Sequence, residues 1–322
     1  TQTPAQGASA AEMRRHWCAQ RTLRVASVIA GLVQESLDHT DILLVTDERF
    51  DPANLAAIES GAKALAMAGL DPSSIDALVL STTTPDRTVP ATSATVQNAL
   101  GLSCGAFDVN AACSGFVYAL VNAYGLIAMG AEKVLVIGTD TLSRITDWTD
   151  RNTCVLFGDG AGAVVLKADA EAGILSTHLH ADGGKKELLY NPVGVSAGFK
   201  PEEKNAGVRV LMTGNEVFKH AVKALDAVVD ETLAANGLDK SDLDWLIPHQ
   251  ANLRIIEATA KRLEMPMDRV IVTVHKHGNT SSGSVPLALD EAVRSGKVQR
   301  GQLLLLEAFG GGFTWGSALI RY

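Results

Sequence analysis

Cys113 lies where an apolar helix is expected to begin, because the segment Phe116–Met129 is strongly apolar and Gly130 follows it as a stop. Unpaired backbone N–H groups and the helix dipole favour a negative charge at such a position. We therefore expect the pKa of this thiol to fall below about 8.5, the value of a free cysteine. A thiolate there can attack a carbonyl and hold an acyl group as a thioester. A buried structural cysteine is the alternative interpretation.

Three other segments place polar or glycine residues near the ends of predicted strands: Pro248–Asn252, His277–Gly283 and Phe309–Phe313. The side chains of His249 and Asn279 can hydrogen-bond an oxygen that gains negative charge, and backbone N–H groups at glycines can approach an oxyanion closely. A cysteine, a histidine and an asparagine that converge beside glycines suit acyl transfer.

Each of these features also has a purely structural interpretation. His249 could be a hydrogen-bonded structural residue, Asn279 could cap a helix, and the glycines at 310–312 could form a turn. His275 and His277 could begin a metal site, but the sequence offers no third ligand cluster beside them, so we expect no metal.

The segment Gly158–Ala163 has the GxGxxA pattern of a dinucleotide-binding loop. It runs into a predicted strand at 163–166, whereas a phosphate-binding loop of this kind opens a helix. We therefore expect no nucleotide phosphate at this segment.

An internal duplication organises the chain. The sequence Gly69–Val79 recurs, with substitutions, as Gly237–Ile247, 168 residues later. Two more pairs of segments match at the same offset: Ser114–Val117 with Ser282–Val285, and Leu135–Ile137 with Leu303–Leu305. Three matches in register indicate two copies of one structural unit.

Each copy is predicted to run helix, strand, helix, strand, strand. The first helices are expected at 54–68 and 215–236, and the last strands at 163–166 and 317–321. A further strand is predicted at 42–45. Helices that alternate with strands are typical of α/β proteins whose buried sheets are covered on both faces.

We predict two halves from this pattern. Residues 1–170 carry Cys113, and residues 171–322 carry His249 and Asn279. When two similar halves pack together, matching strand ends lie close to each other. The duplication therefore predicts a single site at the junction of the halves.

The composition excludes several classes of protein. Of the 322 residues, 47 % are apolar and 20 % are charged, which allows a large core. The formal net charge of −8 argues against nucleic acid as a partner. No apolar run is long enough to span a membrane, and residues 1–11 lack the pattern of a signal peptide. The scattered cysteines predict neither disulfides nor a zinc cluster, and they favour the cytoplasm.

Four segments together resemble β-ketoacyl-acyl carrier protein synthase III, the initiating condensing enzyme of bacterial type II fatty acid synthesis. They are Ala112–Phe116, Pro248–Asn252, His277–Ser281 and Glu307–Phe313. The resemblance, which covers residues 54–322, implies a homodimer with a thiolase-like fold, in which two duplicated halves form a layered α/β/α/β/α sandwich. It also implies an acyltransferase that uses acyl-CoA and malonyl-acyl carrier protein as substrates and needs no cofactor.

The resemblance implies a role for each residue. Cys113 attacks acyl-CoA and keeps the acyl group; the enolate formed by decarboxylation of malonyl-acyl carrier protein then attacks this thioester. His249 and Asn279 hydrogen-bond the malonyl thioester oxygen as it becomes an enolate. The N–H groups of Cys113 and Gly311 form an oxyanion hole, and Phe309 packs against the site. The alternatives are a related thiolase-fold condensing or acyl-transfer enzyme of secondary metabolism and a catalytically silent scaffold that binds acyl carriers.

Two binding surfaces follow from the resemblance. The residues that match the family's CoA-binding positions are Arg151, Met212, Asn215, Phe218, Ala221, Asn252 and Ile255. The acidic carrier protein is expected to dock on a basic patch made of Lys219, Arg254, Lys261 and Arg262. Such a patch steers an acidic partner and weakens with salt. An ordinary solvated helix face is the alternative for Lys261 and Arg262.

The chain also departs from the family pattern. An Asp-Glu-Trp-Ile segment and an Arg-Thr-Gly-Ile segment are absent before Asp51, so the Trp and Arg that hold the CoA adenine have no counterpart, and Trp17 is in a different context. Asn152 stands where the family commonly has Gly, beside Arg151. Val89 takes a place in the active-site packing that is often filled by a Phe that narrows the acyl pocket. We therefore expect primers longer than acetyl to be accepted.

Overall fold

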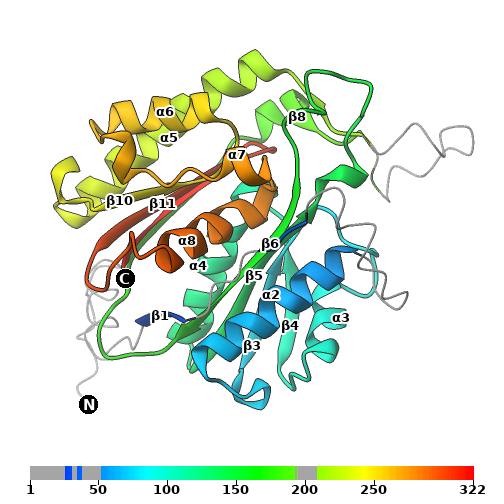
Figure 1. The fold of residues 1–322 in the computed structure, drawn as a ribbon, viewed down its shortest axis with the longest axis vertical. Coiled ribbons are helices and arrows are strands. Elements are labelled where there is room, and N and C mark those ends of the chain that lie inside the picture. The colour runs from blue at the N-terminus through cyan, green and yellow to red at the C-terminus, as the bar shows by residue number, and fades with distance from the viewer. Residues whose placement is uncertain (1–25, 31–34, 38–51, 193, 195–208) are drawn as a thin grey trace, which may run out of the picture.

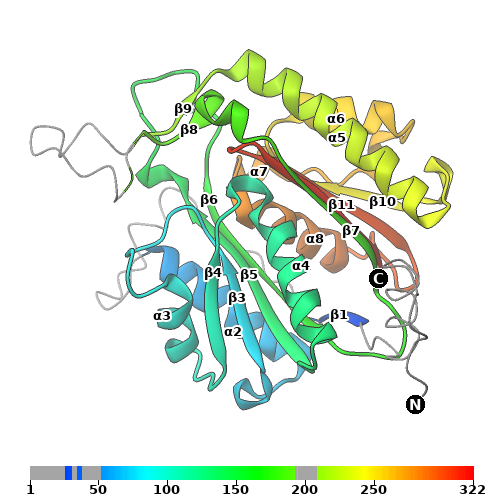
Figure 2. The ribbon, with the colours of Figure 1, turned by 180° about the vertical axis from the view of Figure 1, so that it is seen from behind.

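The computed structural model describes residues 26–30, 35–37, 52–192, 194 and 209–322. Two main β-sheets lie in these parts of the chain, with helices on their outer faces and two helices between them (Figures 1 and 2). The predicted layered α/β sandwich is therefore confirmed. The predicted strand at 42–45 and Trp17 lie outside the described residues.

The first sheet contains the strands of the N-terminal half. Their order is β1 (Ala26–Ala30), β6 (Asp159–Lys167), β5 (Lys133–Thr141), β3 (Ala77–Ser81) and β4 (Gly105–Val109), and β2 (Glu35–Leu37) also pairs with β6. Strand β3 is parallel to both β4 and β5, whereas β6 is antiparallel to β5. Because layers cover both faces, β3 is buried along its whole length.

The second sheet repeats this arrangement. Its order is β10 (Trp245–Pro248), β11 (Leu303–Gly310), β12 (Thr314–Arg321) and β7 (Ile174–Ala181). Strand β10 is parallel to β11, as β3 is to β5 in the first sheet. Strand β12 is antiparallel to β11, as β6 is to β5. We propose that the halves meet at 170/171, in the connection between β6 and β7.

The offset between the two copies is not constant. Ala77 pairs with Val134, and its counterpart Trp245 pairs with Leu304. The offset is thus 168 residues for β3 and β10 but 170 for β5 and β11, so the predicted match of Leu135 to Leu303 was wrong by two residues. Side chains alternate between the two faces of a sheet with a period of two. A shift of two residues therefore leaves each side chain of the matched strands on the face that was predicted for it.

Helices form the other three layers. α2 (Pro52–Ala68) and α3 (Thr92–Ala99) cover the outer face of the first sheet, and α5 (Gly214–Asn236) and α6 (Leu253–Arg262) cover the outer face of the second. α4 (Gly115–Ala128) and α8 (Ser284–Arg294) lie between the sheets. Shorter elements complete the described chain: α7 (Val274–His277), β8 (Leu189–Tyr190) and β9 (Leu211–Met212). None of the described helices has the length and apolar character needed to cross a membrane.

The central layer holds the largest cluster of buried apolar side chains. Phe116, Val117 and Leu120 of α4 meet Val285 and Leu289 of α8 among the strands of both sheets. α4 is apolar on nearly all sides because a sheet covers each face. Each large side chain buried here contributes about 1.5–3 kcal/mol to stability.

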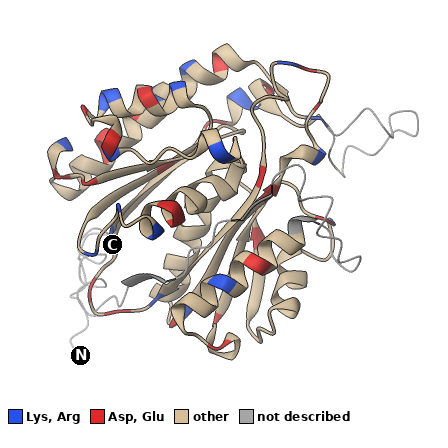
Figure 3. Cartoon of the chain, viewed as in Figure 1, with Lys and Arg blue, Asp and Glu red and all other residues tan. Residues whose placement is uncertain are grey.

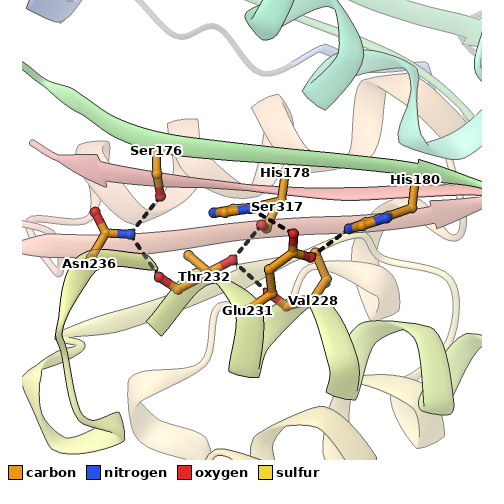
Figure 4. Close-up of polar contacts among 8 residues, drawn as sticks. All are labelled: Ser176, His178, His180, Val228, Glu231, Thr232, Asn236 and Ser317. Atoms are coloured by element: carbon orange, nitrogen blue, oxygen red, sulfur yellow. Dashed lines mark hydrogen bonds and ion pairs between the residues drawn. The ribbon is translucent and has the colours of Figure 1, made fainter. Parts of the chain in front are cut away.

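Polar contacts attach α5 to the second sheet (Figure 4). The Glu231 carboxylate lies 2.6 Å from Nε2 of His180 and 3.2 Å from Nδ1 of His178, both on β7. One residue further along α5, the Thr232 hydroxyl lies 2.7 Å from the Ser317 hydroxyl. These contacts set the position of a helix whose first half lines the site described next.

Candidate active site

Cys113, His249 and Asn279 line one cavity of about 550 Å³, together with Phe309. All four residues are nearly buried, with exposed fractions of 5–8 %. They come from strand ends and turns of the two halves, so the packing of the halves brings them together. Residues of α5 and α6 form much of the rest of the cavity wall, facing these four residues.

Cys113 lies in a short 3₁₀ turn, Ala112–Ser114, that leads directly into α4. Burial raises the pKa of its thiol to about 12, a hydrogen bond with the Ser281 side chain lowers it, and the negative charge of Asp140 raises it further. The expected lowering by the helix start was therefore wrong, because the loss of hydration on burial outweighs it.

The end of β11 passes directly against the turn that holds Cys113. A Cβ atom on Gly310 would lie 2.6 Å from the backbone N of Cys113, so only glycine fits at this position. The Thr314 hydroxyl donates a 2.8 Å hydrogen bond to the carbonyl of Ala111. The turn of the first half is thus fixed by a strand of the second.

His249 follows β10, and its N–H donates a 2.7 Å hydrogen bond to the Glu307 carbonyl. Its Nδ1 lies 2.5 Å from the Ser284 hydroxyl, which itself accepts a 3.3 Å hydrogen bond from the N–H of Gln250. A serine hydroxyl that donates to Nδ1 leaves the ring hydrogen on Nε2. Burial lowers the pKa of His249 to about 3, so the imidazole is neutral near pH 7.

Backbone and side-chain hydrogen bonds both hold Asn279. Its N–H donates to the Leu156 carbonyl at 2.8 Å, and its carbonyl accepts from the N–H of Gly158 at 2.9 Å. Its Oδ1 accepts a 2.9 Å hydrogen bond from the N–H of Ser281. This contact closes a local turn and is not a helix cap, because the N-cap residues of the following 3₁₀ turn and of α8 are Thr280 and Gly283. The Asn279 side chain also hydrogen-bonds the Cys113 thiol, for which its NH₂ group is the donor.

The glycine-rich start of β6 serves packing. A Cβ atom on Gly158 would lie 2.1 Å from the His277 carbonyl oxygen, and one on Gly162 would lie 2.7 Å from Pro286. These glycines let β6 approach the segment that carries Asn279, in agreement with the expectation of no phosphate loop. Within the described residues, no group of three or more His, Cys, Asp or Glu side chains is arranged to hold a metal ion.

Most of the residues that match CoA-binding positions line the larger cavity. They are Met212, Asn215, Phe218, Ala221, Asn252 and Ile255. Arg151 is exposed and does not belong to the lining, whereas its neighbour Asn152 does. Phe309 packs against Phe313, with 4.7 Å between ring centroids, and thereby forms part of the wall beside α5.

The predicted basic patch has mixed charge, as Figure 3 shows on α5 and α6. Arg254 lies on the cavity lining, with its guanidinium 5.2 Å from the centre of the Phe218 ring. Lys219 pairs with Glu216 at 2.7 Å. Arg262 pairs with two carboxylates of α5, Asp226 and Asp230. Lys261 is exposed on α6.

A second, smaller cavity of about 200 Å³ lies on the other side of Cys113. It shares Cys113, Phe157 and Leu189 with the larger one. Its remaining lining residues are Thr83, Asn110, Ala112, Leu142, Ile145, Tyr190, Asn191, Val210, Ser281 and Gly311. Apart from Gly311, sequence reasoning gave none of these a role. Val89 is 83 % exposed and lines neither cavity.

Comparison with known proteins agrees with this geometry. The family model described as 3-oxoacyl-[acyl-carrier-protein] synthase III matches residues 107–183, and the model of the C-terminal part of the same enzyme matches residues 233–322. A β-ketoacyl-[acyl-carrier-protein] synthase III of Xanthomonas euvesicatoria pv. vesicatoria is 72 % identical over 262 residues, which are 81 % of this chain and 80 % of the relative.

Solved structures give the same result. The 3-oxoacyl-[acyl-carrier-protein] synthase III of Aquifex aeolicus superposes with a TM-score of 0.81 at 39 % identity, over 93 % of this chain and 99 % of that one. The priming β-ketosynthase of the R1128 polyketide pathway superposes with a TM-score of 0.80 at 31 % identity, over 93 % and 95 % of the two chains. The chain belongs to the β-ketoacyl-[acyl-carrier-protein] synthase III family and is a condensing acyltransferase.

Proposed function

We propose that this enzyme condenses an acyl-CoA primer with malonyl-acyl carrier protein to give 3-oxoacyl-acyl carrier protein, CO₂ and CoA, and so initiates fatty acid synthesis. One observation carries the proposal: Cys113 lies between two cavities. The larger contains His249, Asn279 and most of the residues that match CoA-binding positions, and the smaller has largely apolar walls. A thioester carbonyl at Cys113 would have its carrier on one side and its acyl chain on the other.

In the first half-reaction, the sulfur of Cys113 attacks the carbonyl of acyl-CoA. The N–H groups of Cys113 and Gly311 stabilise the oxyanion of the tetrahedral intermediate. The bond to the CoA sulfur then breaks, and CoA leaves with the proton that the thiol gives up. The acyl chain occupies the smaller cavity, beside Leu142 and Ile145.

In the second half-reaction, malonyl-acyl carrier protein replaces CoA and loses CO₂. The electron pair of the broken C–C bond forms an enolate, whose oxygen accepts hydrogen bonds from Nε2 of His249 and the NH₂ group of Asn279. Because His249 is neutral, it stabilises the negative charge of the enolate by donating a hydrogen bond and does not act as a proton donor in the reaction. The enolate carbon attacks the thioester, and the Cys113 thiolate leaves and takes a proton from solution.

We also propose a cytoplasmic homodimer. β4 is the last strand of the first sheet, and Phe107 on it is 37 % exposed, so a second copy could add to this edge. Val89 is exposed and lines neither cavity of its own chain, so we propose that it lies beside the acyl pocket of the second copy. A valine in place of phenylalanine then favours primers longer than acetyl. Turnover of C2 to C10 acyl-CoAs tests this, and strict acetyl preference would contradict it.

Mass spectrometry after incubation with acyl-CoA tests the main proposal. An acyl adduct on Cys113 is expected in the wild type and not in Cys113→Ala, and its absence from the wild type would favour the silent scaffold. Release of CO₂ on addition of malonyl-acyl carrier protein distinguishes the initiating synthase from an acyl-transfer enzyme of secondary metabolism. His249→Ala and Asn279→Ala should keep the adduct and lose CO₂ release.

A further inference from the structure

Asp140 lies at the end of β5, fully buried, and its two carboxylate oxygens serve different halves of the protein. Oδ1 accepts hydrogen bonds from the loop after β3: 2.7 Å from both the N–H and the hydroxyl of Thr83, and 3.2 Å from the hydroxyls of Thr82 and Thr84. Oδ2 accepts from the N–H of Ser282 at 3.0 Å and from its hydroxyl at 2.7 Å. One side chain thus joins a loop of the first half to a turn of the second.

The turn held by Oδ2 is the one that orients Asn279. Ser282 follows Ser281, whose N–H donates to Oδ1 of Asn279 and whose side chain contacts Cys113. The Ser282 hydroxyl also lies 3.0 Å from the carbonyl of Ser81. If Asp140 released Ser282, the N–H of Ser281 would no longer hold the carboxamide of Asn279 in one orientation.

The duplication gives a second argument. With the 170-residue offset of the sheet register, Asp140 corresponds to Gly310. The turns Ala112–Ser114 and Ser281–Gly283 correspond because each is a 3₁₀ turn that leads directly into a helix between the sheets, α4 in one copy and α8 in the other. In one copy the strand end places a carboxylate on the N–H of Ser282. In the other copy, the strand end is Gly310, and a Cβ atom added to this glycine would lie 2.6 Å from the backbone N of Cys113. The same approach of strand to turn thus admits only a glycine at the nucleophile and holds a hydrogen-bonding carboxylate at the turn behind Asn279.

We propose that Asp140 is a positioning residue for the malonyl half-reaction: it clamps the Ser281–Ser282 turn, so that the carboxamide of Asn279 stays aimed at the enolate oxygen. This inference rests on the proposed function of Asn279. It requires that loss of the clamp slow decarboxylation more than acylation. A residue that only stabilised the fold would affect both half-reactions alike.

Asp140→Asn is the decisive variant. Both carboxylate oxygens of Asp140 accept hydrogen bonds, whereas the NH₂ group of an asparagine is a donor and would face the donor groups of either Thr83 or Ser282. The enzyme is first acylated to completion by acyl-CoA, as checked by mass spectrometry, and CO₂ release from malonyl-acyl carrier protein is then followed. We expect decarboxylation to fall about 100-fold, the usual effect of a misplaced catalytic group, with acylation within about threefold of the wild type. Alkylation of Cys113 by iodoacetamide should shift to lower pH, since the charge of Asp140 raises the pKa of that thiol.

Ser282→Ala removes the 2.7 Å contact of the hydroxyl with Oδ2, together with its contacts with the carbonyls of Ser81 and Thr139, and keeps the N–H contact with Oδ2. It should slow decarboxylation about tenfold while acylation is retained. Asp290→Asn is the matched control, because Asp290 is equally buried, pairs with Arg294 on α8 and lines neither cavity. It should lower thermal stability and leave the ratio of the two half-reactions unchanged.

The inference is overturned if Asp140→Asn lowers both half-reactions by the same factor or lowers neither. If Asp140→Asn does not fold, the ratio measured for Ser282→Ala decides by the same criterion. A wild-type enzyme that shows neither half-reaction would instead overturn the proposed function, and the inference with it. A wild type with both half-reactions and an unchanged ratio in the variants would overturn the inference alone.

Discussion

The hydroxyl oxygen of Ser284 lies 2.5 Å from Nδ1 of His249, and it also accepts the backbone N–H of Gln250. When the hydroxyl donates to Nδ1, the imidazole carries its hydrogen on Nε2, from which it can donate to an enolate oxygen. We predict that Ser284→Ala slows malonyl decarboxylation about 10- to 100-fold, because the ring loses its orientation and tautomer, and that it spares acylation of Cys113. Single-turnover CO₂ release from acylated enzyme measures this.

Ser295→Ala is a suitable control for Ser284→Ala, since Ser295 lies at the end of the same helix and its hydroxyl donates to the Ala292 carbonyl. If Ser284→Ala released CO₂ at the wild-type rate, the tautomer of His249 would be set by groups other than Ser284.

The reactivity of Cys113 should depend on pH in an unusual way. Because burial raises the pKa of its thiol to about 12, the thiolate fraction keeps growing well above the pKa of a free cysteine. We predict that alkylation by iodoacetamide rises about tenfold per pH unit from pH 7 to pH 10. The rate is read by mass spectrometry from the peptide containing Cys113 in a Cys104→Ser, Cys154→Ser background. If the alkylation rate instead reached a plateau below pH 9, the helix start would lower the pKa of Cys113 by more than burial raises it.

Glu307 should make stability depend on pH. Burial raises the pKa of its carboxyl group to about 8 from 4.5, and a contact with the Thr259 hydroxyl offsets only part of this rise. The folded protein therefore keeps this proton where the unfolded chain releases it. The free energy of unfolding that Glu307 contributes is fully present below pH 4.5 and is lost as the pH rises through 8, by up to about 1.4 kcal/mol per pH unit.

Glu307→Gln removes this titration. We predict that the variant gains stability relative to the wild type between pH 5.5 and 8.5, as measured by urea denaturation. Glu187→Gln, at an exposed site, should show no such trend. Parallel stability curves for Glu307→Gln and the wild type would mean that the carboxyl group is charged in the folded protein.

The four basic residues expected to dock the carrier protein should contribute unequally. Two carboxylates already neutralise Arg262, whereas Arg254 lies at the cavity, stacked on Phe218. We predict that Arg254→Ala raises the KM for malonyl-acyl carrier protein about tenfold and Arg262→Ala less than twofold, with the effect of Arg254→Ala shrinking in salt. Steady-state kinetics at low and high ionic strength measure both, and a larger effect of Arg262→Ala would contradict this ranking.

Much of the site could be predicted because it lies at strand ends and helix starts. A predicted strand followed by polar or glycine residues indicated His249 and the glycines at 310–312, and the start of an apolar helix indicated Cys113. Asn279 was found in the segment before the matching helix of the second half, the role of Gly311 came from the family resemblance, and the duplication explained why these residues meet. Asp140 carried the same signal, since it ends the buried strand β5, but no chemistry was assigned to it.

Other properties depend on tertiary contacts that no local pattern contains. The pKa of Cys113 follows from burial between two sheets, and the neutralisation of Arg262 comes from a helix more than thirty residues away in sequence. The smaller cavity is lined in part by Leu189 and Tyr190 of β8 and by Val210, which directly precedes β9. Each of these strands has two residues, too few to show a periodicity in the sequence.

The correspondence between Asp140 and Gly310 has a consequence for any attempt to rebuild this enzyme from two identical copies. A chain with aspartate at both strand ends would press a side chain against the turn that holds its own nucleophile, because a Cβ atom at position 310 already lies 2.6 Å from the N of Cys113. A chain with glycine at both would leave the N–H and hydroxyl of Ser282 without their carboxylate partner. Two identical copies therefore could not make both contacts.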